Sequence, residues 1–325
     1  PVALAPPWGD GAQRHGGRMR RDLPFIVFFT AMMVETIGVL DSGVWINFVA
    51  MALLATLLAQ AWNLLGGFGG QFSFGHALFF GCGAYTQAIL QLSGGLGAWP
   101  ALALSVTVAA AVGAAVGALS FRYGLRGSYF ALACAEVFRV GALSLDITGG
   151  GVGLMLPLQE GFSRLQFGSR KGYALVLLAF VAAALVVSSW LRHSRFGAQL
   201  QAVRDNEDAA RAVGVDPFTV KLRASMMSAA FMGAAGALYL QMFQYIDPAI
   251  AFGPAISVEA LVGAIVGGMG TLWGPVLGAV VLHLLAEGTR NLFGQLPGIN
   301  MVIYGAVLVL IVTFLPRGLA GLGRS

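Results

Sequence analysis

Charged residues are scarce in this sequence. Only 10% of its 325 residues are Asp, Glu, Lys or Arg, whereas 58% are hydrophobic. Soluble domains carry about 25% charged residues, so this composition excludes an ordinary soluble protein and predicts an integral membrane protein. At ~20 residues per transmembrane helix, the chain has room for roughly eight to ten spans and little else.

The sequence also lacks the residues of several kinds of functional site. Its two cysteines, Cys82 and Cys134, lie inside apolar segments, which excludes a disulfide framework and favours buried free thiols. Its two lysines, Lys171 and Lys221, do not lie in a G-x-x-x-x-G-K-[ST] loop, so we do not expect the chain to bind ATP or to be an enzyme. We expect no metal cluster and no cofactor. The net charge of +5 collects at the ends of apolar segments, where membrane topology explains it without nucleic acid.

The first residues are rich in proline and glycine. The stretch PVALAPPWGDGAQRHGG predicts disorder and contains no secretory signal. Met19, in MRRDLPF, is a more natural start, so we interpret residues 1–18 as a tag or an overextended start. We therefore expect a disordered segment over residues 1–22 and a single membrane domain over residues 23–320.

Ten apolar segments predict an all-α, polytopic membrane protein with about 8–10 transmembrane helices. They cover residues 23–40, 43–65, 73–92, 98–120, 128–146, 173–191, 222–246, 256–268, 272–288 and 301–315. The pieces 256–268 and 272–288 are short and are joined by GGMGTLWGP, so they form either two broken spans or one re-entrant pair.

The basic residues favour one orientation in the membrane. If the N-terminus is cytoplasmic, 14 of the 19 Lys and Arg residues fall on the cytoplasmic side and 4 fall outside, with Arg139 inside a span. Cytoplasmic loops of membrane proteins are enriched in Lys and Arg. Both termini are therefore predicted to be cytoplasmic.

One segment contrasts with this apolar background. The chain has 19 basic and 14 acidic residues, and ten of these 33 lie within residues 192–223. The pattern predicts a single amphipathic helix over 198–213, with an apolar stripe formed by Leu200, Val203, Ala210 and Val213.

Local signals predict how this helix ends. Gly214 fits a C-terminal cap, and Asp216–Pro217 fits the start of the next helix. Both charge signs are mixed with small residues, which indicates docking to a protein groove rather than to lipid. An ordinary solvated loop is the alternative.

Two groups of polar residues lie inside apolar segments. Glu136 and Arg139 are three residues apart and share a helix face, so they form either part of a substrate pathway or a self-neutralised pair. Gln71, Ser73 and His76 lie in GGQFSFGHALFF, where glycines are expected to break the helix and expose backbone groups to a polar cavity. For His76 the alternative is a satisfied contact between helices. The spacing does not match the G-x-S-x-G motif of a hydrolase.

The stretch EDAARAVG, Glu207–Gly214, resembles the ATPase-coupling motif of ABC importer permeases. Its surroundings resemble the branched-chain amino acid permease family, specifically the LivM-type subunit. Further stretches that fit this family in the same order are NLLGGFGGQFSFGHALFFGCGAY (63–85), LRGSYFALACAEVFRV (125–140), TGGGVGL (148–154), GGMGTLWGPVLGAV (267–280) and FLPRGLAGL (314–322). The resemblance covers about residues 45–322. It departs at ALACAEVFRV, where the family more often has a Thr-Leu-Gly-like run, so the role of the residues before Glu136 stays open.

This resemblance implies a multi-pass permease of the bacterial inner membrane that pairs with a LivH-type permease. It implies that two ATP-binding cassette ATPase subunits dock on the 192–223 loop and that a periplasmic solute-binding protein delivers the substrate. The coupling residues would be Arg204, Glu207, Ala209, Ala210 and Gly214, with both alanines against the ATPase groove. The implied function is ATP-driven import of branched-chain amino acids by alternating access. The family also carries urea and short amides. An ion-coupled secondary transporter and a passive channel are the alternative classes.

Overall fold

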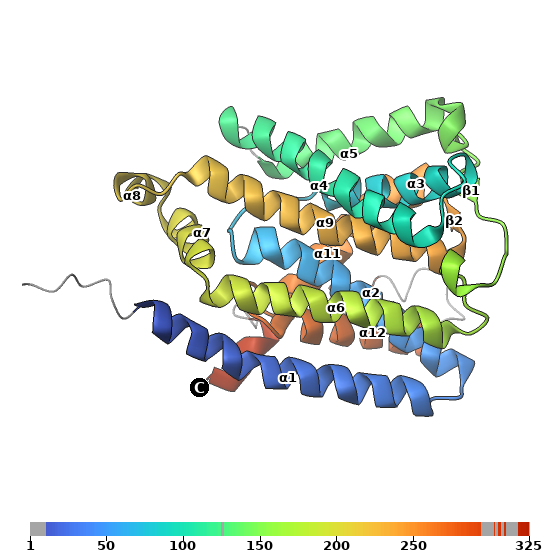
Figure 1. Cartoon of the computed structure of the whole chain (residues 1–325), viewed down its shortest axis with the longest axis horizontal. Coiled ribbons are helices and arrows are strands. Elements are labelled where there is room, and N and C mark those ends of the chain that lie inside the picture. The colour runs from blue at the N-terminus through green and yellow to red at the C-terminus, as the bar shows by residue number, and fades with distance from the viewer. Residues whose placement is uncertain are drawn as a thin grey trace, which may run out of the picture.

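The computed structural model describes residues 11–124, 127–293, 302, 305, 306, 309 and 318–324. Long helices run side by side in one bundle (Figure 1), which confirms the predicted all-α architecture. Within the described residues, six helical stretches are long and apolar enough to cross a membrane. They belong to α1 (Gly11–Val39), α2 (Gly43–Trp62) with the π-helical turn η1 (Asn63–Gly67), α4 (Ala98–Arg122), α6 (Arg170–His193), α9 (Pro217–Phe243), and α10 (Pro248–Phe252) with α11 (Pro254–Gly267).

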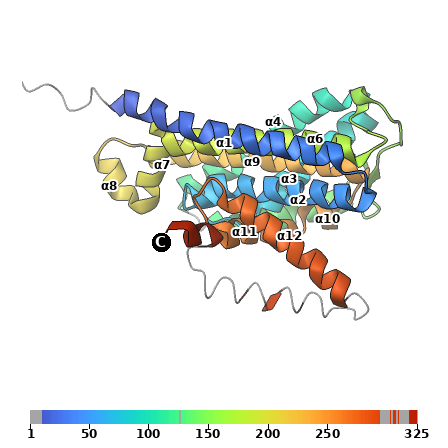
Figure 2. The ribbon, with the colours of Figure 1, turned by 90° about the horizontal axis from the view of Figure 1, so that it is seen from below.

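Three further helices lie along the bundle: α3 (His76–Leu92), α5 (Gly127–Ser144) and α12 (Gly274–Phe293). Nine of the ten predicted apolar segments thus correspond to helices, and the tenth, 301–315, lies almost entirely outside the described residues. The region 256–288 forms two helices. With α10, α11 makes a 20-residue candidate span, whereas α12 has 20 residues but is not among the six candidate spans. Figure 2 shows α12 leaving the bundle axis on the side away from α1.

The helix α1 starts earlier than the sequence predicts. It begins at Gly11, so the expectation of disorder up to residue 22 is wrong for residues 11–22, and residues 1–10 lie outside the described part. The prediction rested on prolines and glycines, but the prolines lie within 1–10. The run from Arg18 to Asp22 consists mainly of Arg and Met, which have high helix propensity and extend the membrane helix.

Helix α9 lies against α3, α4 and α2, and small residues let the backbones approach closely. A Cβ added to Gly83 would lie 2.1 Å from the Gly233 carbonyl oxygen, and one added to Gly236 would lie 2.0 Å from the Phe80 carbonyl oxygen. A side chain at either position would push α3 away from α9. Glycine at these positions therefore sets the spacing of the central helices.

The two ends of the bundle differ in structure. The short helices α7 (Arg195–Asp205) and α8 (Glu207–Ala212), the start of α1 and the described C-terminal turn η4 (Leu319–Arg324) share one end (Figure 1). At the other end β1 (Leu154–Met155) pairs antiparallel with β2 (Tyr245–Ile246). The segments predicted to be cytoplasmic thus gather at the α7–α8 end. Which side of the membrane this end faces stays a prediction.

Candidate functional site

The charged segment between α6 and α9 folds as two short helices. The prediction of one helix over 198–213 is wrong, because the backbone is extended at Asn206, with φ −158° and ψ 109°. The Asn206 side chain accepts a hydrogen bond from the Ala209 N–H at 3.0 Å and so caps α8. Asn favours N-caps over helix interiors, and the acidic Glu207 and Asp208 suit the first turn of a helix.

The predicted caps that follow are confirmed. Gly214 has φ +87°, a left-handed conformation that glycine adopts without steric cost. Asp216 caps α9: its carboxylate accepts from the Thr219 hydroxyl and from the Phe218 and Thr219 N–H groups. These hydrogen bonds, led by that of the Thr219 hydroxyl, lower the pKa of Asp216 below its usual range.

The apolar faces of α7 and α8 are docked on the bundle. Leu200, Val203 and Ala210 are buried in a cluster with residues of η1, α6 and α9: Leu64, Leu65, Leu191, Val220 and Ala224. Val213 is 78% exposed, so the predicted stripe ends before it. Ala210 is only 3% exposed, which contradicts its predicted place against an ATPase. The break at Asn206 turns Ala210 inward and leaves its neighbour Ala209 on the surface.

An ion pair fixes α8 to α9. The Glu207 carboxylate accepts a hydrogen bond from Lys221 Nζ and lies 3.5 Å from the Arg211 guanidinium. The Lys221 side chain is 11% exposed, and its Nζ lies 5.8 Å from the centre of the Phe121 ring on α4. Sequence reasoning missed Lys221. The available signal was a lone lysine in the first turns of an otherwise apolar span.

Arg204 connects α7 with the glycine-rich segment that follows α2. Its guanidinium donates to the Gly67 carbonyl oxygen at 3.2 Å. Its aliphatic part covers Gly70, where an added Cβ would lie 2.3 Å from Arg204 Cγ. Gly70 has φ +65°, so both space and backbone conformation favour glycine there. Arg204 therefore holds the segment directly before Gln71.

The two glycine-rich breaks, 66–70 and 267–270, contact each other. The Asn63 side chain donates to the Thr271 carbonyl oxygen at 3.0 Å and accepts from the Gly270 N–H at 2.8 Å. A Cβ on Gly67 would lie 2.6 Å from the Gly270 nitrogen. A π-helical turn such as η1 often marks a functional site in a helix. Here it ends at the residue that Arg204 holds.

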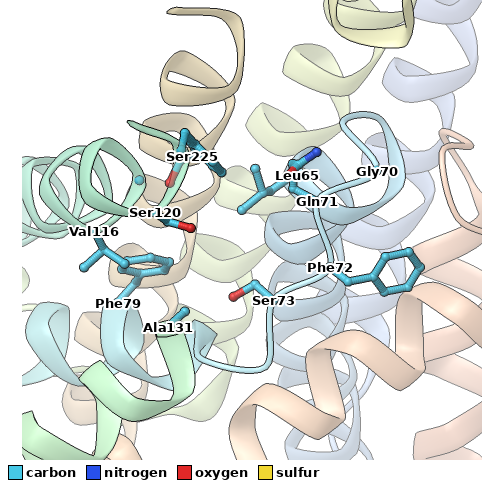
Figure 3. Close-up of a pocket in the computed structure, with 12 residues that line it drawn as sticks. Leu65, Gly70, Gln71, Phe72, Ser73, Phe79, Val116, Ser120, Ala131 and Ser225 are labelled. Carbon is cyan, nitrogen blue, oxygen red and sulfur yellow. The ribbon is translucent and has the colours of Figure 1, made fainter. Parts of the chain in front are cut away.

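A pocket of about 230 Å³ lies next to the 70–73 segment (Figure 3). Gln71 and Ser73 line it, together with residues of η1, α3, α4, α5 and α9. Its walls are mainly apolar, with Phe79, Val116 and Phe121 among them. The Ser120 hydroxyl is buried without a hydrogen-bond partner in the described structure. The pocket can therefore receive a small solute that is largely apolar and offers hydrogen-bonding groups.

The other predicted pathway residues lie elsewhere. His76 is fully buried, and its Nε2 lies 2.9 Å from the Ser228 hydroxyl, which donates to the Ala61 carbonyl oxygen at 2.7 Å. His76 thus joins three helices, which is the contact given as its alternative, and it does not line this pocket. Sequence spacing could not show that α9 supplies a hydroxyl opposite this ring.

Glu136 and Arg139 form the predicted pair, but away from the pocket. Arg139 donates to the Glu136 carboxylate at 2.9 and 2.6 Å. Their side chains are 57% and 30% exposed, on the face of α5 that points away from the bundle. Glu136 is the tenth of 18 residues in α5. Helix α5 lies along the bundle of candidate spans, and charged residues at membrane depth are rare and usually face protein or a water-filled cavity, so this exposure needs an explanation.

Comparison with known proteins gives consistent matches. A family model described as the permease component of the branched-chain amino acid transport system matches residues 44–312. The high-affinity branched-chain amino acid transport system permease protein LivM of Salmonella typhimurium (strain LT2) is 30% identical over 308 residues, which cover 86% of this chain and 70% of that protein. LivM of Escherichia coli (strain K12) is 28% identical, over 92% of this chain and 75% of that protein. LivH of Salmonella typhimurium is 23% identical, over 85% of this chain and 94% of that protein. No solved structure matches the chain significantly.

Proposed function

The chain belongs to the family of permease components of branched-chain amino acid transport systems, and on that premise we propose that it is the membrane-spanning subunit of an ATP-driven importer. The observation that carries this proposal is the α7–α8 segment, residues 194–216. It forms an exposed, charged surface at one end of the bundle and is bonded to the helices behind it. The sequence has no phosphate-binding loop, so the energy of ATP hydrolysis must enter through a partner bound to such a surface.

Two chains of contacts lead from α7–α8 to the pocket. The first runs from Arg204 to Gly67 and Gly70, which directly precede the pocket residue Gln71. The second runs from Glu207 to Lys221 and on to Phe121, which also lines the pocket. A displacement of α7–α8 by an ATPase would therefore move two walls of the same pocket. This is the arrangement that alternating access requires at its gate.

We propose branched-chain amino acids as the substrates. The pocket residues are apolar or neutral, and none of the described lining residues is charged. Such a lining suits an aliphatic side chain and does not favour a net positive or negative solute. The complete importer would contain a LivH-type permease and two ATPase subunits at the α7–α8 end. A periplasmic binding protein would dock at the β1–β2 end, and the complex would lie in the bacterial inner membrane.

Reconstitution tests this proposal. The chain would be co-expressed with its LivH-type permease and ATPases, placed in liposomes and supplied with the binding protein. We expect leucine uptake that requires ATP and exceeds the uptake of urea and acetamide. Uptake that needs no ATPase and follows an imposed proton gradient would contradict the proposal and favour a secondary transporter.

A further inference from the structure

Helix α5 lies at the edge of the bundle (Figure 1), with α3 and α10 on its inner side. Its inner face carries small buried residues, among them Ala131, Ala135 and Ala142. Its outer face, which we call the α5 face, consists of Tyr129, Leu132, Glu136, Val137, Val140 and Leu143. Val137 is 69% exposed, so few neighbouring side chains pack against it. The described residues thus leave uncovered a strongly apolar face with an acidic residue at its centre.

The hydrogen bonds of Arg139 are incomplete. Its guanidinium has five N–H donors, and two of them bind the Glu136 carboxylate. Among the described residues, no other group accepts a hydrogen bond from Arg139. Lipid tails carry no acceptors, so within a membrane the remaining N–H groups need a protein surface, water, or headgroup oxygens reached by snorkelling.

Helix α1 shows what a lipid-facing helix of this bundle looks like. It is also exposed, with Phe28 at 68%, close to the 69% of Val137. Between Asp22 and Glu35, however, its sequence LPFIVFFTAMMV contains no charged residue. The span of α1, Asp22–Val39, has two charged residues, Asp22 and Glu35, and both lie near its ends, where the membrane surface is near. The α5 face differs because its charges lie at the middle of the helix.

We propose that the α5 face is the surface on which the second permease subunit packs, with hydrogen-bond acceptors of that subunit opposite Arg139. This inference rests on the proposed function, which supplies the second subunit. The inner side of α5 adds a reason for such an interface, because Ala131 lines the pocket and its backbone contacts Gly75 closely. A partner on the α5 face would thus press on the helix that forms one wall of the pocket.

Site-specific photo-crosslinking tests this interface in the whole complex. The photoreactive residue p-benzoylphenylalanine replaces Val137 on the α5 face or, as the control of equal exposure, Phe28 on α1. The complex is expressed with a differently tagged second permease and irradiated in membranes. We expect an adduct of this chain with the second permease from position 137 and none above background from position 28. Position 140 provides a second probe on the α5 face if the variant at 137 does not fold.

The outcomes separate the interface from the proposed function. If the second permease co-purifies but neither 137 nor 140 crosslinks to it, the α5 face is not the interface, whereas the proposed function stands. Adducts with a second copy of this chain, or equal adducts from position 28, also overturn the inference. If no second permease co-purifies at all, both proposals fail. As a further check, Arg139→Gln should lose most of the second permease in pull-downs while ATPase binding persists.

Discussion

Among single residues, Arg204 has the most direct role in the proposed coupling. It joins the charged surface of α7 to the glycines before Gln71 through one hydrogen bond to Gly67 and a close packing contact with Gly70. Neither contact contributes to the docking surface itself. Arg204 should therefore transmit movement without being needed for partner binding.

We expect Arg204→Ala to separate ATPase binding from ATPase stimulation. Losing a partly exposed hydrogen bond of about 1 kcal/mol should lower substrate-stimulated ATP hydrolysis about fivefold, with ATPase subunits still co-purifying. Arg211→Ala is the control, because the salt bridges of Arg211 in the described structure are with Glu207 and Asp208 of α8 and not with the 66–70 segment. Equal loss of stimulation in both variants would show that the contact with Gly67 is not part of the route.

Ala209 and Ala210 should respond differently to the same substitution. Ala209→Arg adds a side chain at an exposed site and should leave the chain stable while it abolishes ATPase co-purification. Ala210→Arg forces a charge into the cluster around Leu200, where overpacking alone costs about 1–3 kcal/mol. It should lower the yield of folded protein in size-exclusion chromatography. The reverse pattern would contradict the orientation of α8.

The Glu136–Arg139 pair allows a double-mutant test. Either Glu136→Gln or Arg139→Gln alone leaves an uncompensated charge in the membrane, so each should lower the melting temperature more than the double variant does. The measurement is thermal unfolding of the purified chain in one detergent. If the double variant is the least stable of the three, the pair is not held together by mutual neutralisation.

Several of these residues could be predicted from the sequence, and the reasons are local. Gly214 and Asp216 were predictable because a left-handed cap and an N-cap depend on a few adjacent residues. The direction of Ala210 was not, because the periodicity argument assumed a continuous helix through Asn206. The partners of His76 and Glu207 come from distant helices, and no spacing rule in one sequence identifies such contacts.

At the scale of elements, the long apolar helices were predictable from the sequence, but the short segments that connect or extend them were not. Hydropathy locates α2, α4, α6 and α9 because a transmembrane helix needs about 20 consecutive, mainly apolar residues. The short helix α10 extends α11 past the break at Gly253. This extension makes 248–267 long enough to be a candidate membrane span. Hydropathy alone did not predict α10, because Asp247 and Pro248 are typical of a loop.

The start of α9 should depend on pH through Asp216. Because hydrogen bonds hold its folded pKa below the ordinary value, its carboxylate stabilises the helix start at pH values above the unfolded pKa, ~4. This stabilisation is lost as the pH falls through the lower folded pKa. Hydrogen exchange of the 218–220 amides, corrected for intrinsic rates, should therefore show protection that declines in acid. Asp216→Asn keeps a capping oxygen without the charge and should remove this decline; an unchanged decline would assign it to another group.

At the scale of the whole molecule, the pocket and the docking surface belong to one assembly. The pocket combines residues of η1, the 70–73 segment, α3, α4, α5 and α9, which lie up to 160 residues apart in sequence. The order of these segments was predictable, but their convergence was not, because it depends on glycine contacts between helices such as Gly83–Gly233. The two ends of this assembly should meet different partners, with ATPases at α7–α8 and the binding protein at β1–β2.

Disulfide crosslinking at the two ends tests this account most directly. Ala209→Cys would place a thiol on the exposed side of α8, and Val152→Cys would place one at the opposite end, where Val152 is 82% exposed. Each variant would carry Cys82→Ser and Cys134→Ser and would be assembled with cysteine-substituted ATPase and binding protein. We predict ATPase adducts only from position 209, together with labelling of position 152 by a membrane-impermeant reagent from outside the cell. ATPase adducts from position 152, or external labelling of position 209, would contradict both the orientation and the coupling role of α7–α8.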